Sequence, residues 1–173
     1  YKPDIGKEII GLIKKNTRVI FIESPGSLTF VIQDIPMLVE VAKKNNLITM
    51  MDNTWATSLF YKPLCNGIDI SIQSATKYIV GHSDAMLGII TTNKKYTKSI
   101  RESAHNMGSC PGPEDIYLGI RGLKTLSIRL QKHQENAFKV IEWLKTRQEV
   151  DKILYPALPD NAGHKIWKRD FLG

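Results

Sequence analysis

Hydrophobic and polar positions along the first half of the chain alternate between helical spacing and the short apolar runs of buried strands. Apolar residues recur at helical spacing from Ile5 to Ile13 and again after Asp34, the expected N-cap of a helix. Four segments have the character of strands, namely residues 18–23, 47–51, 68–73 and 87–92. This order predicts the α/β class, with a mainly parallel sheet covered by helices on both faces.

The fourth strand is expected to run antiparallel to the third. Only 13 residues separate Gln73 from Leu87, and they contain no clear crossover helix. A parallel connection needs a crossover of about a dozen residues or more, usually a helix. An antiparallel strand therefore fits this stretch better than another parallel one.

The second half of the chain is predicted to be largely helical. Apolar residues keep helical spacing from Pro113 to about Arg147, which predicts a long helix broken near Gly119 to Gly122. Prolines and a glycine then punctuate the chain from Pro156 to Gly163. We therefore divide the chain into a body at residues 1–150 and the start of a smaller domain at residues 151–173.

Composition narrows the class of protein. The chain has 173 residues, of which 42% are hydrophobic and 24% charged, as is usual for a globular protein. No apolar run approaches the roughly 20 residues of a membrane span, and no signal segment opens the chain. We therefore expect a cytoplasmic protein without a membrane partner. Because the sequence begins at Tyr1 and stops at Gly173, we also expect an internal fragment of a longer protein.

The formal net charge of +7 raises the question of nucleic-acid binding. That function requires Lys and Arg clustered on one face, with aromatic residues between them. Here the basic residues are scattered, and lysine pairs fall near the ends of predicted helices, at residues 14–15, 43–44 and 94–95. We therefore expect no nucleic-acid partner.

Residues that could bind a metal ion are few and poorly spaced. Cys65 and Cys110 show neither the paired spacing of a zinc site nor the density of a disulfide scaffold, so we interpret both as reduced and structural. His82 and Asp84 have no second histidine at a suitable spacing. A hydrogen-bonded turn is the favoured interpretation of this pair, with a metal ligand or a proton relay as the alternative.

Candidate chemistry converges on Lys77, which comes after a strand and after the small residues Ser74, Ala75 and Thr76. Small neighbours permit close approach of a cofactor, and a lysine in such a place can form a Schiff base with an aldehyde. Asp52 ends the preceding strand and could face a protonated pyridine nitrogen. The hydroxyl groups could donate to a phosphate. These groups match what pyridoxal 5′-phosphate requires from a protein.

Simpler interpretations of the same residues remain open. Lys77 is one of 24 basic residues and could be an ordinary solvated lysine. Asp52 could cap the turn at Asn53-Thr54. Glu23 either orients groups around the cofactor or is a surface carboxylate, and Trp55 could line the pocket. The pairing of Asp52 with Lys77 is what favours a cofactor site.

Several separated motifs resemble the fold-type-I pyridoxal-phosphate enzymes of cysteine and methionine metabolism. They are Glu23-Ser24-Pro25-Gly26-Ser27, Asp52-Asn53-Thr54-Trp55, Ser74-Ala75-Thr76-Lys77-Tyr78, Gly81-His82-Ser83-Asp84, and Arg121-Gly122-Leu123-Lys124-Thr125-Leu126 with Arg129 and His133. The segment Ser24 to Ser27 and the residue Trp55 differ from the γ-acting members. In this respect the chain is most similar to the bacterial cystathionine β-lyase branch.

The resemblance implies a fold and a set of site residues. Residues 1–150 would be the central, incomplete part of an aspartate aminotransferase-like large domain that includes a long C-terminal helix, and residues 151–173 would begin the small domain. The implied roles are Lys77 as catalytic and cofactor-binding lysine, Asp52 at the ring nitrogen, Ser74 and Thr76 at the phosphate, and Glu23 and Trp55 around the pocket, with no metal.

The resemblance also implies an activity. It is the pyridoxal-phosphate-dependent β-elimination of cystathionine to homocysteine, pyruvate and ammonia in methionine biosynthesis, by a homotetramer acting on a small sulfur amino acid. One alternative is a γ-acting member, such as a cystathionine γ-lyase, a γ-synthase or a methionine γ-lyase. Another is a truncated, non-catalytic remnant that acts only as an association module.

Overall fold

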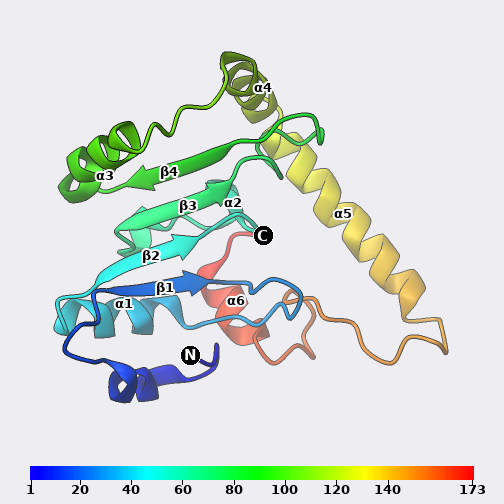
Figure 1. The fold of residues 1–173 in the computed structure, drawn as a ribbon. Coiled ribbons are helices and arrows are strands. Elements are labelled where there is room, and N and C mark those ends of the chain that lie inside the picture. Colours follow the sequence, from blue (N-terminus) through cyan, green and yellow to red (C-terminus); the bar gives the residue numbers. More distant parts are fainter.

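A four-stranded sheet organises the chain, which a computed structural model describes over residues 1–173 (Figure 1). Its strands lie in the order β1 (Val19–Glu23), β2 (Ile48–Asp52), β3 (Ile70–Ser74) and β4 (Gly88–Thr92). The first three strands are parallel, and β4 runs antiparallel to β3. The predicted direction of the fourth strand is therefore confirmed.

Helices connect and flank these strands. They are the 3₁₀ helices η1 (Gly6–Leu12) and η2 (Leu64–Asn66) and the α-helices α1 (Ile35–Lys44), α2 (Thr57–Phe60), α3 (Lys94–Asn106), α4 (Pro113–Leu123), α5 (Leu126–Leu144) and α6 (His164–Asp170). None of them combines the length and the hydropathy that crossing a membrane requires.

The long helix predicted after Pro113 is broken, as predicted, but slightly later than expected. Its two parts, α4 and α5, are separated at Lys124 and Thr125, just after Gly122. Gly119 and Gly122 are instead buried within α4, where a side chain on either would overlap Leu87 or the carbonyls of Ile79 and Val80. These glycines permit close packing and do not break the helix.

The hydrophobic core lies between the sheet and α1. Ile20 and Ile22 of β1 are buried in the same cluster as Ile35 and Leu38 of α1. The alternate β1 residues point away from this cluster, so Phe21, for example, is 51% exposed. The sheet is mixed and carries helices, as predicted. Within this chain, however, α1 covers only the face of β1 that carries Ile20 and Ile22, and the opposite face, with Phe21, is exposed.

The last segment of the chain returns to the same core. Phe171 is buried in the cluster, with its ring centroid 4.9 Å from that of Tyr61. Burial raises the pKa of the Tyr61 phenol, and the nearby charge of Asp170 makes a smaller contribution in the same direction. Part of the segment 151–173 thus packs on the core formed by the earlier part of the chain. The division into two domains near residue 150 remains a prediction.

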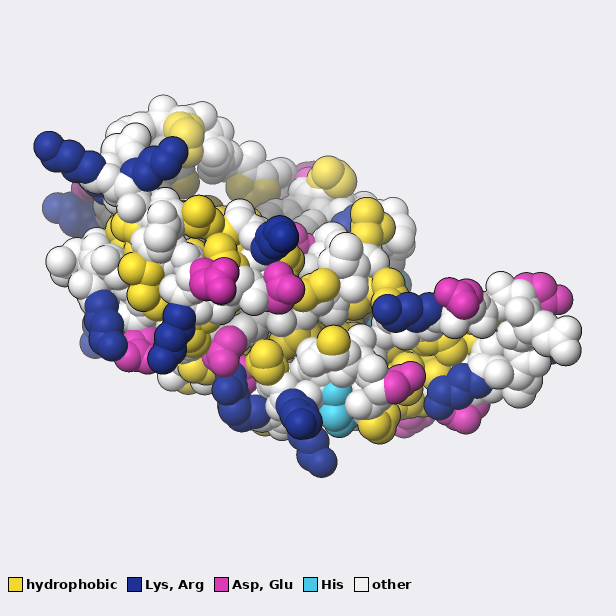
Figure 2. Space-filling view, turned by 90° about the horizontal axis from the view of Figure 1, so that it is seen from below, with side chains coloured by type: hydrophobic (Ala, Val, Ile, Leu, Met, Phe, Trp, Pro, Cys, Tyr) yellow, Lys and Arg dark blue, Asp and Glu magenta, His cyan; other side chains and the backbone are white.

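Charges and thiols at the surface are dispersed. On the face drawn in Figure 2, Lys and Arg side chains are spread over the surface, with Asp and Glu side chains among them. Cys65 and Cys110 are free thiols, as expected, but both are exposed. The exposure of both residues argues against the structural role expected for them, because neither cysteine is removed from water.

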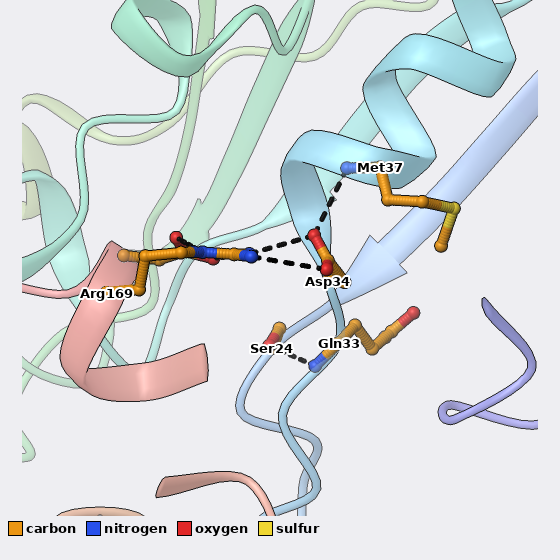
Figure 3. A network of polar contacts seen from close by, with 6 residues as sticks. Ser24, Gln33, Asp34, Met37 and Arg169 are labelled. Carbon is orange, nitrogen blue, oxygen red and sulfur yellow. Dashed lines mark hydrogen bonds and ion pairs between the residues drawn. The ribbon is translucent and has the colours of Figure 1, made fainter. Parts of the chain in front are cut away.

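Asp34 joins α1 to α6 (Figure 3). Its Oδ1 accepts a hydrogen bond of 3.2 Å from the backbone N of Met37, as expected of an N-cap, and one of 2.9 Å from Arg169 Nη2. Partial burial alone would raise the pKa of Asp34. The hydrogen bonds from Arg169 and Met37, together with the arginine's charge, outweigh this effect and lower the pKa.

We expect Asp34→Asn to lower the free energy of unfolding by up to about 1 kcal/mol at pH 7, because the amide keeps the cap but loses the ion pair. A carboxylate with a lowered pKa stabilises the fold above its unfolded pKa of about 4, and this contribution is lost as pH falls through the folded value. The difference between variant and wild type should therefore shrink in chemical denaturation at pH 3. Glu40→Gln, at an exposed pair on the same helix, is the control. An equal difference at both pH values would contradict the prediction.

Candidate functional site

A cleft of about 1120 Å³ opens at the carboxyl ends of β1, β2 and β3. Parallel strands bring their last residues to one edge, and the register pairs Glu23 directly with Asp52. The connection after β3 forms another wall, and α5 lies on the side toward which these three strands point (Figure 1). The cleft is lined by every site residue predicted from the sequence: Glu23, Asp52, Trp55, Ser74, Thr76 and Lys77.

Lys77 lies in the turn that follows β3, as predicted. Its backbone N donates to Ser74 O at 3.1 Å, and its carbonyl accepts from Gly81 N at 2.8 Å. The turn is closed by a further bond of 2.8 Å from Val80 N to Ala75 O. The Lys77 amine is exposed in the cleft and has no ion-pair partner within the chain. The turn therefore fixes the backbone of Lys77 at the cleft, while its side chain has no partner within the chain.

Asp52 combines the two interpretations that the sequence left open. Its Oδ1 accepts from Thr54 N at 2.8 Å, which is the turn cap. The Thr54 hydroxyl in turn accepts from Ser74 N at 2.7 Å, which fixes the end of β2 against the end of β3. The other carboxylate oxygen has no hydrogen bond within the chain. One oxygen thus holds the turn while the second is free for a ligand.

The two hydroxyl groups beside Lys77 differ in what they can do. The Ser74 hydroxyl makes no hydrogen bond within the chain, so it can donate to a ligand in the cleft. The Thr76 hydroxyl accepts from Leu87 N at 2.9 Å and is 3.3 Å from Leu87 O. It would have to give up its bond to Leu87 O to donate to a phosphate. Ser74 is therefore the better prepared donor.

Glu23 and Trp55 line the same cleft as the Lys77 turn. Glu23 Oε1 accepts from Ser27 N at 3.0 Å and also from the Ser27 hydroxyl. The Trp55 ring packs edge-on against Phe30, with the ring centroids 6.4 Å apart. Glu23 thus orders the loop after β1, while Trp55 provides an apolar wall to the cleft.

The residues around His82 form a turn and no metal site. His82 Nδ1 lies 2.8 Å from Val80 O, and Asp84 pairs with Arg121 at 3.4 Å. No group of three or more His, Cys, Asp or Glu side chains in the chain is arranged to hold a metal ion. The geometry supports the hydrogen-bonded turn over the metal ligand.

Arg129 is a residue whose role the sequence did not reveal. It lies on α5, lines the cleft, and donates to the carbonyls of Tyr78, Ile79 and Gly122 at 2.8, 3.1 and 2.8 Å. Partial burial lowers the pKa of its guanidinium. Because its partners are backbone atoms, no pairing of residue types in the sequence indicates this contact.

Gly122 permits α4 to pack against the Lys77 turn, so Gly122→Ala is expected to destabilise the protein by about 1–3 kcal/mol. A Cβ there would lie 2.2 Å from Ile79 O and 2.6 Å from Val80 O. Thermal or chemical denaturation measures the effect. Gly11→Ala is the control, because its Cβ would meet no atom within 4 Å. Equal stability of the two variants would show that α4 moves aside without cost.

A mixed sheet with a lysine, a carboxylate and a free hydroxyl at the ends of its parallel strands defines an α/β protein with an open cleft at its carboxyl edge, where such sheets place their ligands. The sequence profile of the Cys/Met metabolism PLP-dependent enzymes matches residues 1–173, and the chain belongs to that family.

Named relatives and solved structures agree with this assignment. The chain is 47% identical over 173 residues to a putative cystathionine beta-lyase of Saccharomyces cerevisiae, covering 100% of this chain and 51% of the relative. It is 44% identical over 175 residues to the cystathionine beta-lyase MetC of Escherichia coli K12, covering 100% and 44%. The chain thus spans about half the length of the curated relatives it matches.

The fold matches at the level of structure as well. A crystal structure of cystathionine gamma-lyase from Lactobacillus plantarum, complexed with L-serine, aligns with a TM-score of 0.93 and 35% identity. The alignment covers 95% of this chain and 44% of that one. The prediction of a partial fold-type-I pyridoxal-phosphate domain is therefore confirmed.

The cleft residues fit pyridoxal 5′-phosphate, the cofactor of this family. An aldehyde needs an amine that is not held in an ion pair, and the Lys77 amine meets this condition. A protonated ring nitrogen needs an anionic acceptor, and one Asp52 oxygen is free. A phosphate needs donors, and the Ser74 hydroxyl lies in the same cleft without a partner.

Proposed function

We propose that the protein binds pyridoxal 5′-phosphate through Lys77 and serves the β-elimination of cystathionine. In this reaction cystathionine and water give homocysteine, pyruvate and ammonia. The observation that carries the proposal is the free Lys77 amine in one cleft with the free oxygen of Asp52. The 44% to 47% identity to proteins named cystathionine beta-lyases, over the whole of this chain, supports the choice of substrate.

The cofactor, when bound, supplies an electron-accepting ring for the negative charge that develops at the substrate's Cα. Lys77 Nζ would hold the cofactor through its aldehyde carbon. With substrate in the cleft, the same Nζ would accept the Cα proton as a general base. Nζ then delivers a proton to the departing sulfur, so that the carbon–sulfur bond at Cβ breaks and a thiol leaves.

The remaining cleft residues have supporting roles. Asp52 places a negative charge at the ring nitrogen and favours its protonated form. The Ser74 hydroxyl donates to the phosphate, with Thr76 as a further donor. Trp55 and the loop ordered by Glu23 bound the site. The complete protein is proposed to act as a homotetramer on a small sulfur amino acid.

A γ-elimination is the second candidate, favoured by the similarity to the Lactobacillus plantarum structure named as a γ-lyase. Both reactions begin with removal of the Cα proton, so Lys77 and Asp52 serve either one. Products separate them, because β-elimination of cystathionine gives homocysteine and pyruvate, whereas γ-elimination gives cysteine and 2-oxobutyrate.

The proposal is tested by adding pyridoxal 5′-phosphate to the purified protein. A ligand that binds only the folded state at 100 times its Kd raises the free energy of unfolding by about 2.7 kcal/mol. We expect thermal stabilisation, a visible Schiff-base absorbance band and pyruvate release from cystathionine. Release of 2-oxobutyrate would replace the proposal by the γ-reaction. Absence of both binding and stabilisation would favour the non-catalytic remnant.

A further inference from the structure

Arg129 reaches from α5 into the turn that carries Lys77. Its Nη1 donates to Tyr78 O at 2.8 Å, and its Nη2 donates to Ile79 O at 3.1 Å. The same Nη2 donates to Gly122 O at 2.8 Å, so the guanidinium bridges the turn and α4. The Arg129 side chain therefore connects the turn, α4 and its own helix α5.

These contacts suit an arginine in particular. The carbonyls of Tyr78 and Ile79 accept no other hydrogen bond within the chain, so without the guanidinium they would lack a protein partner. A guanidinium presents five donors in a rigid plane, whereas a lysine ammonium is a single point of charge. Nε donates to the Thr125 hydroxyl at 3.0 Å, which fixes the orientation of that plane.

The turn is also shaped around the guanidinium. Gly81 has a φ of +77°, in the left-handed region, and a Cβ there would lie 2.1 Å from Arg129 Nη1. The Gly81 amide in turn bonds the Lys77 carbonyl. The guanidinium therefore fills the space beside a residue that is hydrogen-bonded to Lys77 itself.

We propose that Arg129 is a positioning residue for Lys77, an inference that rests on the proposed function. The Lys77 amine has no side-chain partner, so its reach toward Asp52 depends on the backbone of residues 75–81. Arg129 holds that backbone at the carbonyls of the two residues that follow Lys77. Loss of these bonds would widen the range of positions open to Nζ, and a displacement of about 1 Å can lower a rate by about 100-fold.

The test compares Arg129→Lys with Arg101→Ala, an exposed arginine on α3 that makes no hydrogen bond or ion pair through its side chain. Hydrogen exchange at the amides of Val80 and Gly81 reports the turn without any cofactor. We expect exchange there to rise at least about tenfold in Arg129→Lys. Exchange at the α1 amides of Arg129→Lys should stay unchanged. Exchange at Val80 and Gly81 should also stay unchanged in the Arg101→Ala variant.

Thr125→Val is a milder second variant, because it removes the acceptor of Nε from an exposed position and keeps Arg129. It should raise the same exchange rates by a smaller factor. With pyridoxal 5′-phosphate, Arg129→Lys should form the Schiff-base band about 10- to 100-fold more slowly. Thr125→Val should lie between it and the wild type.

Unchanged exchange at Val80 and Gly81 in both variants would overturn the inference. So would faster exchange with wild-type kinetics of Schiff-base formation, because the turn would then not position Lys77. Failure of the wild-type protein itself to bind the cofactor is a different result. It removes the proposed function, and with it the assignment of Arg129 to that function, even if exchange shows that Arg129 holds the turn.

Discussion

Replacing Lys77 by alanine is expected to abolish the Schiff-base absorbance band and to lower the rate of cystathionine cleavage by more than about 10³-fold. The amine is the group that holds the aldehyde, takes the Cα proton and returns a proton to sulfur. Because the side chain is exposed and makes no hydrogen bond or ion pair, its loss should leave the free energy of unfolding without cofactor nearly unchanged.

Two comparisons make the Lys77 result specific. Lys77→Arg keeps the charge but cannot form the Schiff base, so it should fail in the same way as alanine. Lys94→Ala, at an exposed lysine in the first turn of α3, should behave as the wild type. A small added amine should restore part of the activity of Lys77→Ala. Full activity of that variant would show that another group removes the Cα proton.

Much of the sheet could be predicted because its strands are short apolar runs between clear breaks. The short connection after Gln73, together with the absence of a clear crossover helix in it, indicated that β4 is antiparallel. Helix α3 was expected only from the lysine pair at residues 94–95 and its extent was not predicted, because none of its residues is buried and its mean hydropathy is low. The segment from Ile5 to Ile13 does have helical spacing, but it forms a 3₁₀ helix because the spacing does not distinguish the tighter turn.

The candidate site was predictable where it depends on strand ends. Parallel strands bring Asp52 and Ser74 to one edge whatever the details of packing, and Lys77 follows directly. What the sequence could not provide is the use of each polar atom. In the sequence, Thr76 and Ser74 are equivalent hydroxyl residues beside Lys77. In the structure, the Thr76 hydroxyl is hydrogen-bonded to the backbone of Leu87. Arg129 donates to carbonyls about 50 residues away in the sequence. Backbone acceptors of this kind cannot be recognised from the residue types.

Asp52→Asn is expected to lower the rate of Cα deprotonation by about 10²- to 10³-fold while the fold is kept. The amide oxygen can still accept from Thr54 N, so the turn at the end of β2 should survive. The lost feature is the negative charge that favours a protonated ring nitrogen. Exchange of the substrate's Cα hydrogen with deuterated water, followed by NMR, measures this step separately from release of the thiol.

Asp69→Asn is the matched control, since Asp69 is also a carboxylate beside a strand but has a structural role. Its oxygens accept from Thr49 N at 3.0 Å, from the Thr49 hydroxyl at 3.1 Å and from Asn93 Nδ2 at 2.7 Å. Placing an amide NH₂ against one of these donors should cost about 1–3 kcal/mol of stability and leave the exchange rate per folded molecule intact. The two variants should thus show opposite patterns, one losing rate and the other stability. If Asp52→Asn instead lost stability and kept its rate of exchange, the carboxylate would be a turn cap alone and the ring nitrogen would need another acid.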